Sequence, residues 1–507
     1  MKFKYEVDNR RHFGLSEDRS IFLIFACEQL FFRFMHLTLL IGNWHFIDCP
    51  RAKVSNGLYI NKDTPFTMNS YRNYLKAFAF SLAGLLLAIS PKGRSSTPLD
   101  AQPSFHTEVP HTSQDFVESI GVNTHINYFD TSYGNSAILI RELKSLGIRH
   151  LRDGSALQND DYNNAVYSTW RSLGKLGIRF NMVFDPRGSI RVVRPDLIER
   201  LLSLSGNSVE SIEGPNELDL SKLPNWPELT RTYQQELSSA ARRLPNNPTL
   251  PLIGPSMAFV AAGKQVGSIS PLVTYGNLHS YPAGHLPSDM LPDQIAGASA
   301  MYPGKQIVIT ETGYHNAIND RNQQPPVSEA AAAKYIPRLL FETFNHGIVR
   351  TYLYEFEDEF PDPGAKEQEK HWGLLRNDGT EKPSFIALRN IIATLTDDAN
   401  PPRTRTPHPL AYALQGDTAL IHHTLLEKAD GRYYLALWQE VPSFDVSQRA
   451  DISVAAKMVT IALPRPLTRA RLYDSLQGTA TAVKPTTNSS ITVAVPDHVI
   501  LVEILPS

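Results

Sequence analysis

The chain alternates between short apolar runs and longer amphipathic stretches over most of its length. From about residue 119 to residue 395, each β-rich run is followed by a polar loop and then by a stretch with helical periodicity. The eight runs begin near Val122, Ile148, Ile178, Val209, Leu252, Thr274, Gln306 and Ile348. Their average spacing of about 32 residues is the length of one strand-plus-helix unit.

Eight such units predict an α/β protein built on a (β/α)8 TIM barrel, which we place at residues 104–397. An open doubly wound sheet is the alternative, but no glycine-rich phosphate-binding turn follows the first run. A glycine precedes three of the runs, at Gly147, Gly177 and Gly347. Glycine at these positions suits a helix end that leads into a buried parallel strand.

The pattern changes after residue 397. Residues 398–409 are rich in proline, which indicates a linker between two domains. Residues 410–507 contain several runs in which apolar and polar residues alternate. This period of two is typical of strands with one buried face, so we predict a small all-β sandwich domain there.

The N-terminal region lacks both patterns. We expect residues 1–67 to be an upstream extension that does not belong to the native protein, with translation starting at Met68. Arg72 and Lys76 form a basic segment, which the short apolar run 77–90 follows. We therefore predict that residues 68–103 are a signal peptide and a short linker. The protein would then be secreted or periplasmic, with no stable membrane insertion after cleavage; an uncleaved membrane anchor is the alternative.

Composition narrows the classes of function. The 49 Lys and Arg residues nearly balance the 51 Asp and Glu residues, which argues against nucleic acid as a main partner. The two cysteines, Cys27 and Cys49, provide neither a disulfide framework nor a cysteine-based zinc site. Motifs of phosphate-binding loops, zinc proteases and serine esterases are absent. We therefore expect no cofactor and no metal, and the sequence leaves the oligomeric state open.

Two of the predicted strands end in glutamates. The fourth leads into Asn216-Glu217 and the seventh contains Glu311. In a barrel, the carboxyl ends of all strands meet at one mouth, so Glu217 and Glu311 should face a shared cleft. Two carboxylates across a cleft are what glycosidic cleavage requires, because one protonates the leaving oxygen and the other attacks or activates water. The alternative is that each glutamate is simply a loop residue.

With these residues the chain resembles the retaining glycoside hydrolases of clan A, among which families 5, 30, 39 and 79 all fit. The resemblance covers residues 119–395 and includes the Glu-x-x-Asn-Glu spacing that starts at Glu213. It implies that Glu217 is the acid/base, that Asn216 contacts the sugar 2-hydroxyl and that Glu311 is the nucleophile. The chain departs from the common form at Leu218, where proline is usual, and at 214–215, where Gly-Pro replaces bulkier residues.

Other residues are candidates for substrate binding. The resemblance implies that Arg152, at the end of the second strand, orients the nucleophile; an ordinary salt bridge to Asp153 or a neighbour is the alternative. His279 and Tyr281 end the sixth strand, and alternation places both on the face toward the mouth. A tyrosine there can donate to the nucleophile and a histidine can bind the sugar, although core packing is the plainer interpretation.

Three further residues lie at strand ends or in the loops that follow them. His125 on the first strand and Asp185 after the third are candidate sugar contacts. Trp372 is a candidate stacking platform for a sugar face, with core packing as the alternative.

We therefore expect an exported retaining β-glycoside hydrolase that acts on a poly- or oligosaccharide by double displacement. Glu217 should have a raised pKa so that it can donate a proton, while Glu311 should stay ionised and attack the anomeric carbon. The alternative functions are a non-catalytic carbohydrate-binding protein on a degenerate barrel and a metal-dependent barrel hydrolase.

Overall fold

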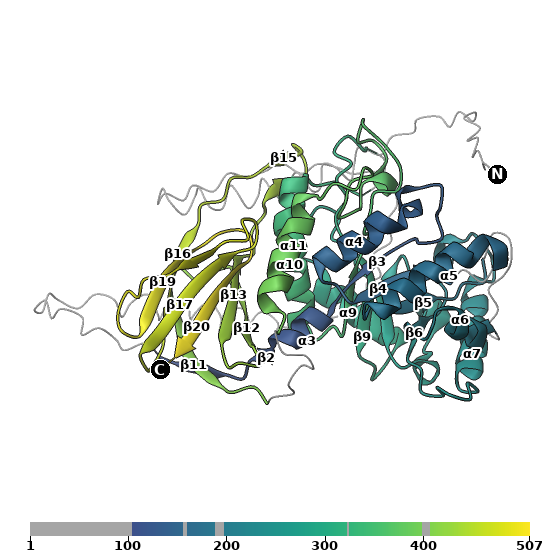
Figure 1. Cartoon of the computed structure of the whole chain (residues 1–507), viewed down its shortest axis with the longest axis horizontal. Coiled ribbons are helices and arrows are strands. Elements are labelled where there is room, and N and C mark those ends of the chain that lie inside the picture. Colours follow the sequence, from purple (N-terminus) through teal and green to yellow (C-terminus); the bar gives the residue numbers. More distant parts are fainter. Residues whose placement is uncertain (1–103, 156–159, 188–196, 322–323, 398–405, 507) are drawn as a thin grey trace, which may run out of the picture. The chain divides into compact units, whose positions relative to one another are not determined.

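The computed structural model describes residues 104–155, 160–187, 197–321, 324–397 and 406–506 (Figure 1). The predicted upstream extension (1–67) and signal peptide (68–103) therefore lie outside the described residues, as does most of the predicted linker. Within the described part of the chain, no helix is both long and apolar enough to cross a membrane.

Eight parallel strands form the barrel, and each begins within a few residues of its predicted start. They are β3 (Ile120–Asn123), β4 (His150–Gly154), β5 (Arg179–Val183), β6 (Val209–Glu213), β7 (Leu252–Ile253), β8 (Gly276–His279), β9 (Ile307–Thr312) and β10 (Thr351–Leu353). They pair in the order β7-β6-β5-β4-β3-β10-β9-β8. A parallel bridge between Ile253 and Tyr275 closes the ring, so the predicted (β/α)8 barrel is confirmed.

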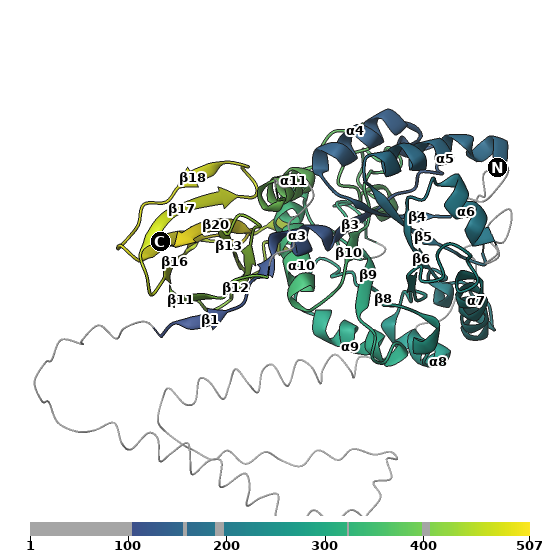
Figure 2. The same ribbon diagram turned by 60° about the horizontal axis from the view of Figure 1, so that its bottom comes forward.

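Helices surround the barrel strands (Figure 2). They are α3 (Ser113–Glu118), α4 (Ser136–Leu146), α5 (Asp160–Lys175), α6 (Ile198–Leu204), α7 (Trp226–Ala241), α8 (Gly263–Val266), α9 (Leu291–Met301), α10 (Glu329–Asn345) and α11 (Pro383–Leu395). Local sequence sets their ends. The side chain of Asn135 caps the first turn of α4, and Gly147 ends it with φ 82°, a backbone conformation that favours glycine.

The C-terminal strands form a sandwich of two sheets, which confirms the predicted second domain. The four-stranded sheet contains β1 (His106–Glu108), β11 (Leu410–Gly416), β16 (Lys457–Ala462) and β19 (Ser490–Val495). The six-stranded sheet contains β18 (Ala480–Ala482), β17 (Leu467–Asp474), β20 (Ile500–Pro506), β13 (Tyr433–Gln439), β12 (Ile421–Glu427) and β2 (His111–Thr112). A hairpin of β14 (Phe444–Asp445) and β15 (Ala450–Asp451) lies outside both sheets.

The first described residues depart from the predicted boundary at 104. β1 pairs antiparallel with β11, and β2 pairs parallel with β12, so residues 106–112 belong to the sandwich rather than to the barrel. The chain therefore enters the barrel only at α3, after it has contributed one edge strand to each sheet of the sandwich.

The centre of the six-stranded sheet, strands β13 and β20, is buried on both faces. Along β13, Tyr433, Leu435 and Leu437 face the core between the two sheets. The alternate residues Tyr434, Ala436 and Trp438 belong instead to the core that contains the barrel helices. This alternation follows from the period of two in a strand, and it joins the sandwich to α10 through one continuous apolar core.

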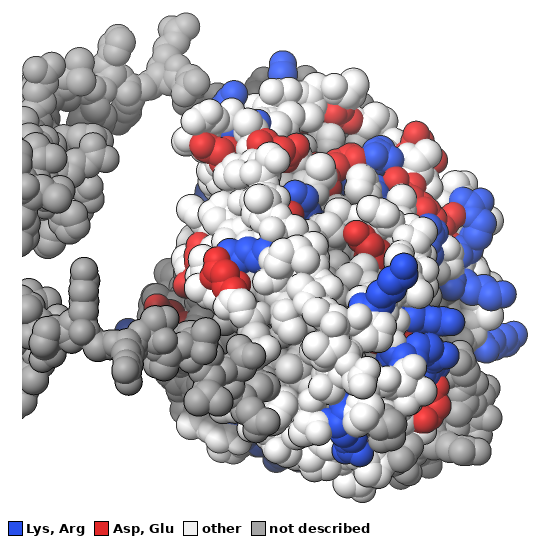
Figure 3. Space-filling view, turned by 90° about the vertical axis from the view of Figure 1, so that its left-hand side faces the viewer, with Lys and Arg blue, Asp and Glu red and all other residues white. Residues whose placement is uncertain are grey.

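The surface of the sandwich carries charges of both signs. In Figure 3, Lys and Arg side chains gather toward one side of the face, while acidic and uncharged side chains cover much of the remainder.

Candidate active site

The two predicted carboxylates meet at the mouth of the barrel. Glu217 follows β6 and Glu311 lies on β9. Together with His279 at the end of β8, each offers one ligand atom, and these three atoms lie within 4.8 Å of one another. The barrel thus brings together two glutamates that the sequence separates by 94 residues.

Arg152, on β4, forms hydrogen bonds to Glu311 and to residues on or after two other strands. Its Nη1 donates to Glu311 Oε1 at 2.7 Å and to Asn123 Oδ1 at 2.8 Å. Its Nη2 donates to Asn216 Oδ1 at 2.6 Å. The structure therefore places the predicted arginine directly on Glu311, and Asp153 is not its partner in any of these contacts.

The main anchor of Arg152 is Glu213, whose role the sequence did not reveal. Nε and Nη2 of Arg152 donate to the two carboxylate oxygens at 2.8 Å each. Glu213 has no exposed surface, and it also accepts hydrogen bonds from Asn181 and Asn277. Because so many donors hold this buried carboxylate in place, it fixes the position of the Arg152 guanidinium.

His279 and Tyr281 both point to the catalytic carboxylates, as alternation along the strand predicts. The Tyr281 hydroxyl donates to Glu311 Oε2 at 2.8 Å. His279 Nδ1 lies 2.6 Å from Glu217 Oε1 and 3.4 Å from Glu311 Oε2. Because only 1% of the His279 side chain is exposed, its position favours contact with Glu217 over the predicted contact with a sugar.

The hydrogen bonds around His279 determine the role of each imidazole nitrogen. The Thr310 hydroxyl donates to Asn277 Oδ1 at 2.7 Å, so its oxygen accepts the Nε2–H of His279 at 3.0 Å. Nδ1 of His279 remains to share a proton with Glu217.

The pKa values of this pair contradict the expectation of a raised pKa for Glu217. Burial raises the pKa of Glu217, but the hydrogen bond and charge of His279 outweigh burial and hold the pKa below its usual value. Burial lowers the pKa of His279, yet the charge of Glu311 and the hydrogen bond to Glu217 raise it above its usual value. The shared proton therefore rests on the imidazole.

The backbone at Glu217 is held in an unfavourable conformation. Its φ of 46° and ψ of 49° place it in the left-handed region, which side chains other than glycine rarely adopt. Its N–H donates to the Ser256 carbonyl at 3.1 Å, and Arg187 donates to the carbonyls of Asn216 and Glu217. Asp185 accepts the Asn216 N–H at 2.9 Å and binds Arg187. Asp185, a candidate sugar contact, therefore positions the Asn-Glu pair.

The departure at 214–215 has a steric reason. A Cβ atom at Gly214 would lie 2.1 Å from Gln234 Oε1 and 3.0 Å from the Pro255 nitrogen. α7 approaches β6 so closely here that a bulkier residue does not fit. Leu218, which stands where proline is usual, is fully buried.

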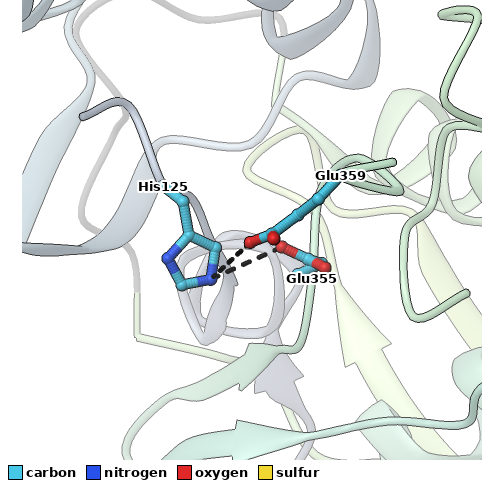
Figure 4. A group of neighbouring side chains, drawn as sticks. All are labelled: His125, Glu355 and Glu359. Carbon is cyan, nitrogen blue, oxygen red and sulfur yellow. Dashed lines mark ion pairs between the residues drawn. The ribbon is translucent and has the colours of Figure 1, made fainter. Parts of the chain in front are cut away.

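The remaining candidates, His125 and Trp372, follow β3 and β10. His125 faces Glu355 and Glu359, which follow β10 (Figure 4). Trp372 is 4% exposed, and its ring lies 5.0 Å from that of Tyr281. This burial favours packing behind Tyr281 over a sugar-stacking platform, and the stacking role stays a prediction.

We compared the chain with known protein families, sequences and structures. No protein-family model and no curated protein sequence matches the chain. Solved structures match: the GH39 enzyme from Xanthomonas axonopodis pv. citri has a TM-score of 0.50 and 13% identity, covering 79% of this chain and 96% of that one. The chain therefore shares its fold with this GH39 enzyme. A monomeric β-xylosidase from Caulobacter crescentus CB15 also matches, with a TM-score of 0.50 and 12% identity over 79% of this chain and 98% of that one.

Proposed function

We propose that the protein is an exported retaining β-glycoside hydrolase in which Glu311 is the nucleophile and Glu217 the acid/base. The main support is that one carboxylate oxygen of Glu217 and one of Glu311 lie within 4.8 Å of each other, at the ends of the fourth and seventh barrel strands. Retaining enzymes place their two carboxyl groups about 5–5.5 Å apart, whereas inverting enzymes leave roughly 6.5–9.5 Å for a water molecule.

In the first step, a Glu311 oxygen attacks the anomeric carbon and the glycosidic oxygen leaves with a proton from Glu217. Arg152 and Tyr281 donate to the two different oxygens of Glu311, which holds the carboxylate in one orientation for attack.

The shared proton gives this step a driving force. The pKa of His279 is raised most by the negative charge of Glu311. That charge disappears as the covalent bond forms, so the imidazole loses its stabilisation and its proton moves to Glu217, which passes it to the leaving oxygen. In the second step, Glu217 accepts a proton from water, the hydroxide attacks the anomeric carbon, and the Glu311 carboxylate is regenerated.

Asn216 is positioned to bind the sugar. Its Oδ1 accepts from Arg152 at 2.6 Å and from Ser256 at 3.3 Å. Because Oδ1 is occupied, the NH2 group of the Asn216 amide is left to donate to a hydroxyl group of the substrate.

The roles are tested with Glu311→Ala and Glu217→Ala on a panel of aryl β-glycosides. The panel includes β-xylosides because one structural neighbour is a β-xylosidase. Glu311→Ala should abolish turnover, and azide should then give an α-configured glycosyl azide. Glu217→Ala should still react with activated aryl glycosides, and azide should restore turnover with a β-configured product.

Glu367→Ala is the matched control, since Glu367 is 62% exposed and pairs only with Lys370 among its described ion-pair contacts. It should retain wild-type turnover. Inverted product from the wild type by NMR, or full activity of Glu311→Ala, would refute the roles. Binding of oligosaccharides without any hydrolysis would support the non-catalytic alternative.

Export is a separate part of the proposal. A gene that starts at Met68 should yield active protein outside the cytoplasm, with a mature N-terminus between about residues 90 and 104. Recovery of peptides from residues 1–67 in the native host would refute the proposed start.

A further inference from the structure

Among the described residues, three groups combine one histidine with two carboxylates whose ligand atoms lie within 4.8 Å of one another. They are Glu217–His279–Glu311, Glu342–His422–Glu440 and His125–Glu355–Glu359. The groups differ in whether the protein itself supplies hydrogen-bond donors and positive charges to these atoms.

The first two groups are internally satisfied. In the catalytic group, both nitrogens of His279 have partners and Glu311 is held by Arg152. In the second group, His422 bonds to Glu342, and the buried guanidinium of Arg338 pairs with Glu440 at 2.8 Å.

The third group differs in this respect. His125 Nε2 lies 3.4 Å from Glu355 Oε2 and 4.0 Å from Glu359 Oε1, and the three side chains converge on one point (Figure 4). Both His125 Nε2 and Glu355 Oε1 are buried without a hydrogen-bond partner in the described part of the chain. The carboxyl group of Glu355 belongs to a side chain with 0% exposure.

Charge is also unbalanced at this group. Within the described residues, no lysine or arginine forms an ion pair with Glu355 or Glu359. Burying a carboxylate without a cation is costly, and so is leaving buried polar atoms unpaired. A cation bound between His125 Nε2, Glu355 Oε2 and Glu359 Oε1 would supply the missing positive charge and a partner for the buried His125 Nε2.

The surroundings hold the three side chains in place. The His125 ring stacks on Tyr128 with a centroid distance of 4.7 Å and meets Tyr133 and Tyr354 edge-on at 5.7 Å. The Tyr133 oxygen accepts the Glu357 N–H, so its own hydrogen goes to Glu355 Oε2 at 3.1 Å.

Glu359 is positioned through its backbone. Its carbonyl accepts hydrogen bonds from the Asn377 side chain at 2.9 Å and from the Ser132 N–H at 3.1 Å. The group is therefore built from fixed elements, a property that metal sites require of their supporting residues.

We propose that His125, Glu355 and Glu359 bind a divalent transition-metal ion such as Zn²⁺ or Mn²⁺ at the mouth of the barrel. Ligands at bond lengths of about 2.0–2.2 Å and tetrahedral angles lie about 3.4 Å apart, so the observed 3.4 and 4.0 Å need only a small contraction. One imidazole with two carboxylates selects a borderline ion of this kind over Mg²⁺ or Ca²⁺, which prefer oxygen ligands alone. The site does not depend on the proposed glycosidase chemistry.

The test uses the full chain, freed of metal with a chelator and titrated with ZnCl₂ or MnCl₂ by calorimetry, with electron paramagnetic resonance to follow free Mn²⁺. We expect one ion per chain. His125→Gln and Glu359→Gln should each weaken binding at least about tenfold. Because 16% of the Glu359 side chain is exposed, Glu359→Gln should fold even if the substitution at His125 impairs folding.

Two controls locate the ion. Glu367→Gln changes an exposed carboxylate in the same loop region, and His422→Gln changes the second group; neither should alter binding. The ion should also raise the Tm of the wild type but not that of Glu359→Gln. Absence of binding to the wild type would overturn the proposal, as would binding that survives both His125→Gln and Glu359→Gln or that is lost in His422→Gln or Glu217→Gln.

Discussion

The buried ion pair between Arg338 and Glu440 should determine the stability of the barrel and sandwich together. Arg338 lies on α10 and has 0% exposure, and Glu440 directly follows β13 with 3% exposure. Arg338 Nε donates to Glu440 Oε2 at 2.8 Å, and Nη1 donates to the carbonyls of Val441 and Asp497 at 3.0 and 3.3 Å.

We predict that Arg338→Met destabilises the protein by about 3–5 kcal/mol. The substitution leaves the Glu440 carboxylate buried without its cation, which is the usual effect of breaking a buried pair from one side. Trp438 Nε1 and the Ser288 hydroxyl still donate to Glu440, at 3.1 and 2.9 Å, which keeps the effect within this range.

The assay is urea denaturation followed in parallel by circular dichroism and by tryptophan fluorescence. Trp438 is fully buried against the helices, and Trp170 and Trp372 are buried in the barrel domain, so tryptophan emission reports the unfolding of both parts. The two signals should change together in the wild type and in Arg338→Met, because one apolar core joins the domains. A second substitution, Glu440→Met, should restore part of the loss by removing the uncompensated charge.

Arg389→Met is the matched control on the neighbouring helix α11. Arg389 pairs with Glu381, and both side chains are about 30% exposed, so the change should be below about 1 kcal/mol. A similarly small effect of Arg338→Met would refute this reasoning, and so would separate unfolding of the sandwich at lower urea.

Three further predictions concern the mouth and the barrel wall. His279→Gln should move the alkaline limb of kcat/KM to lower pH, because the raised imidazole pKa no longer retains the shared proton as pH rises; an unmoved limb would contradict this. Tyr281→Phe should lower kcat about 10- to 100-fold without changing the urea midpoint, since it removes a donor to Glu311. Gly121→Ala should destabilise the protein by about 1–3 kcal/mol in urea, because its Cβ would lie 2.4 Å from the Tyr352 ring.

The barrel strands could be predicted because each carries its own local signal. An apolar run marks a parallel strand that is buried on both sides, and it does so regardless of the strands with which it pairs. The ends are less well defined: β10 starts at Thr351 although the apolar run starts at Ile348. Hydrogen bonds to neighbouring strands set these ends, and the sequence does not show them.

The edge strands β1 and β2 could not be predicted for a related reason. They contain three and two residues, too few for a period of two to be visible. They exist because β11 and β12, which lie about 300 residues further along the chain, offer unpaired edges. Such pairing is a property of the assembled sheets.

The proximity of Glu217 and Glu311 was predictable, and the residues that support them were not. Strand order alone places Glu217 and Glu311 at one mouth. The paired hydrogen bonds between Arg152 and Glu213, however, depend on two side chains that come from different strands and meet inside the barrel. The motif around Glu213 was the only signal available. The neighbours of His125 stayed hidden because the eighth strand meets the first only when the barrel closes.

The charges around the catalytic centre explain why a residue as deeply buried as Glu213 is useful there. Three carboxylates, those of Glu213, Glu217 and Glu311, share the cation of Arg152 and the proton that rests on His279. With both cations present, this group retains one negative charge, which in the proposed mechanism faces the position where the sugar becomes positive in the transition state. Without Glu213, the charge of Arg152 would fall on Glu311 alone and the group would be neutral. Glu213 thus lets one arginine orient Glu311, the proposed nucleophile, without neutralising it.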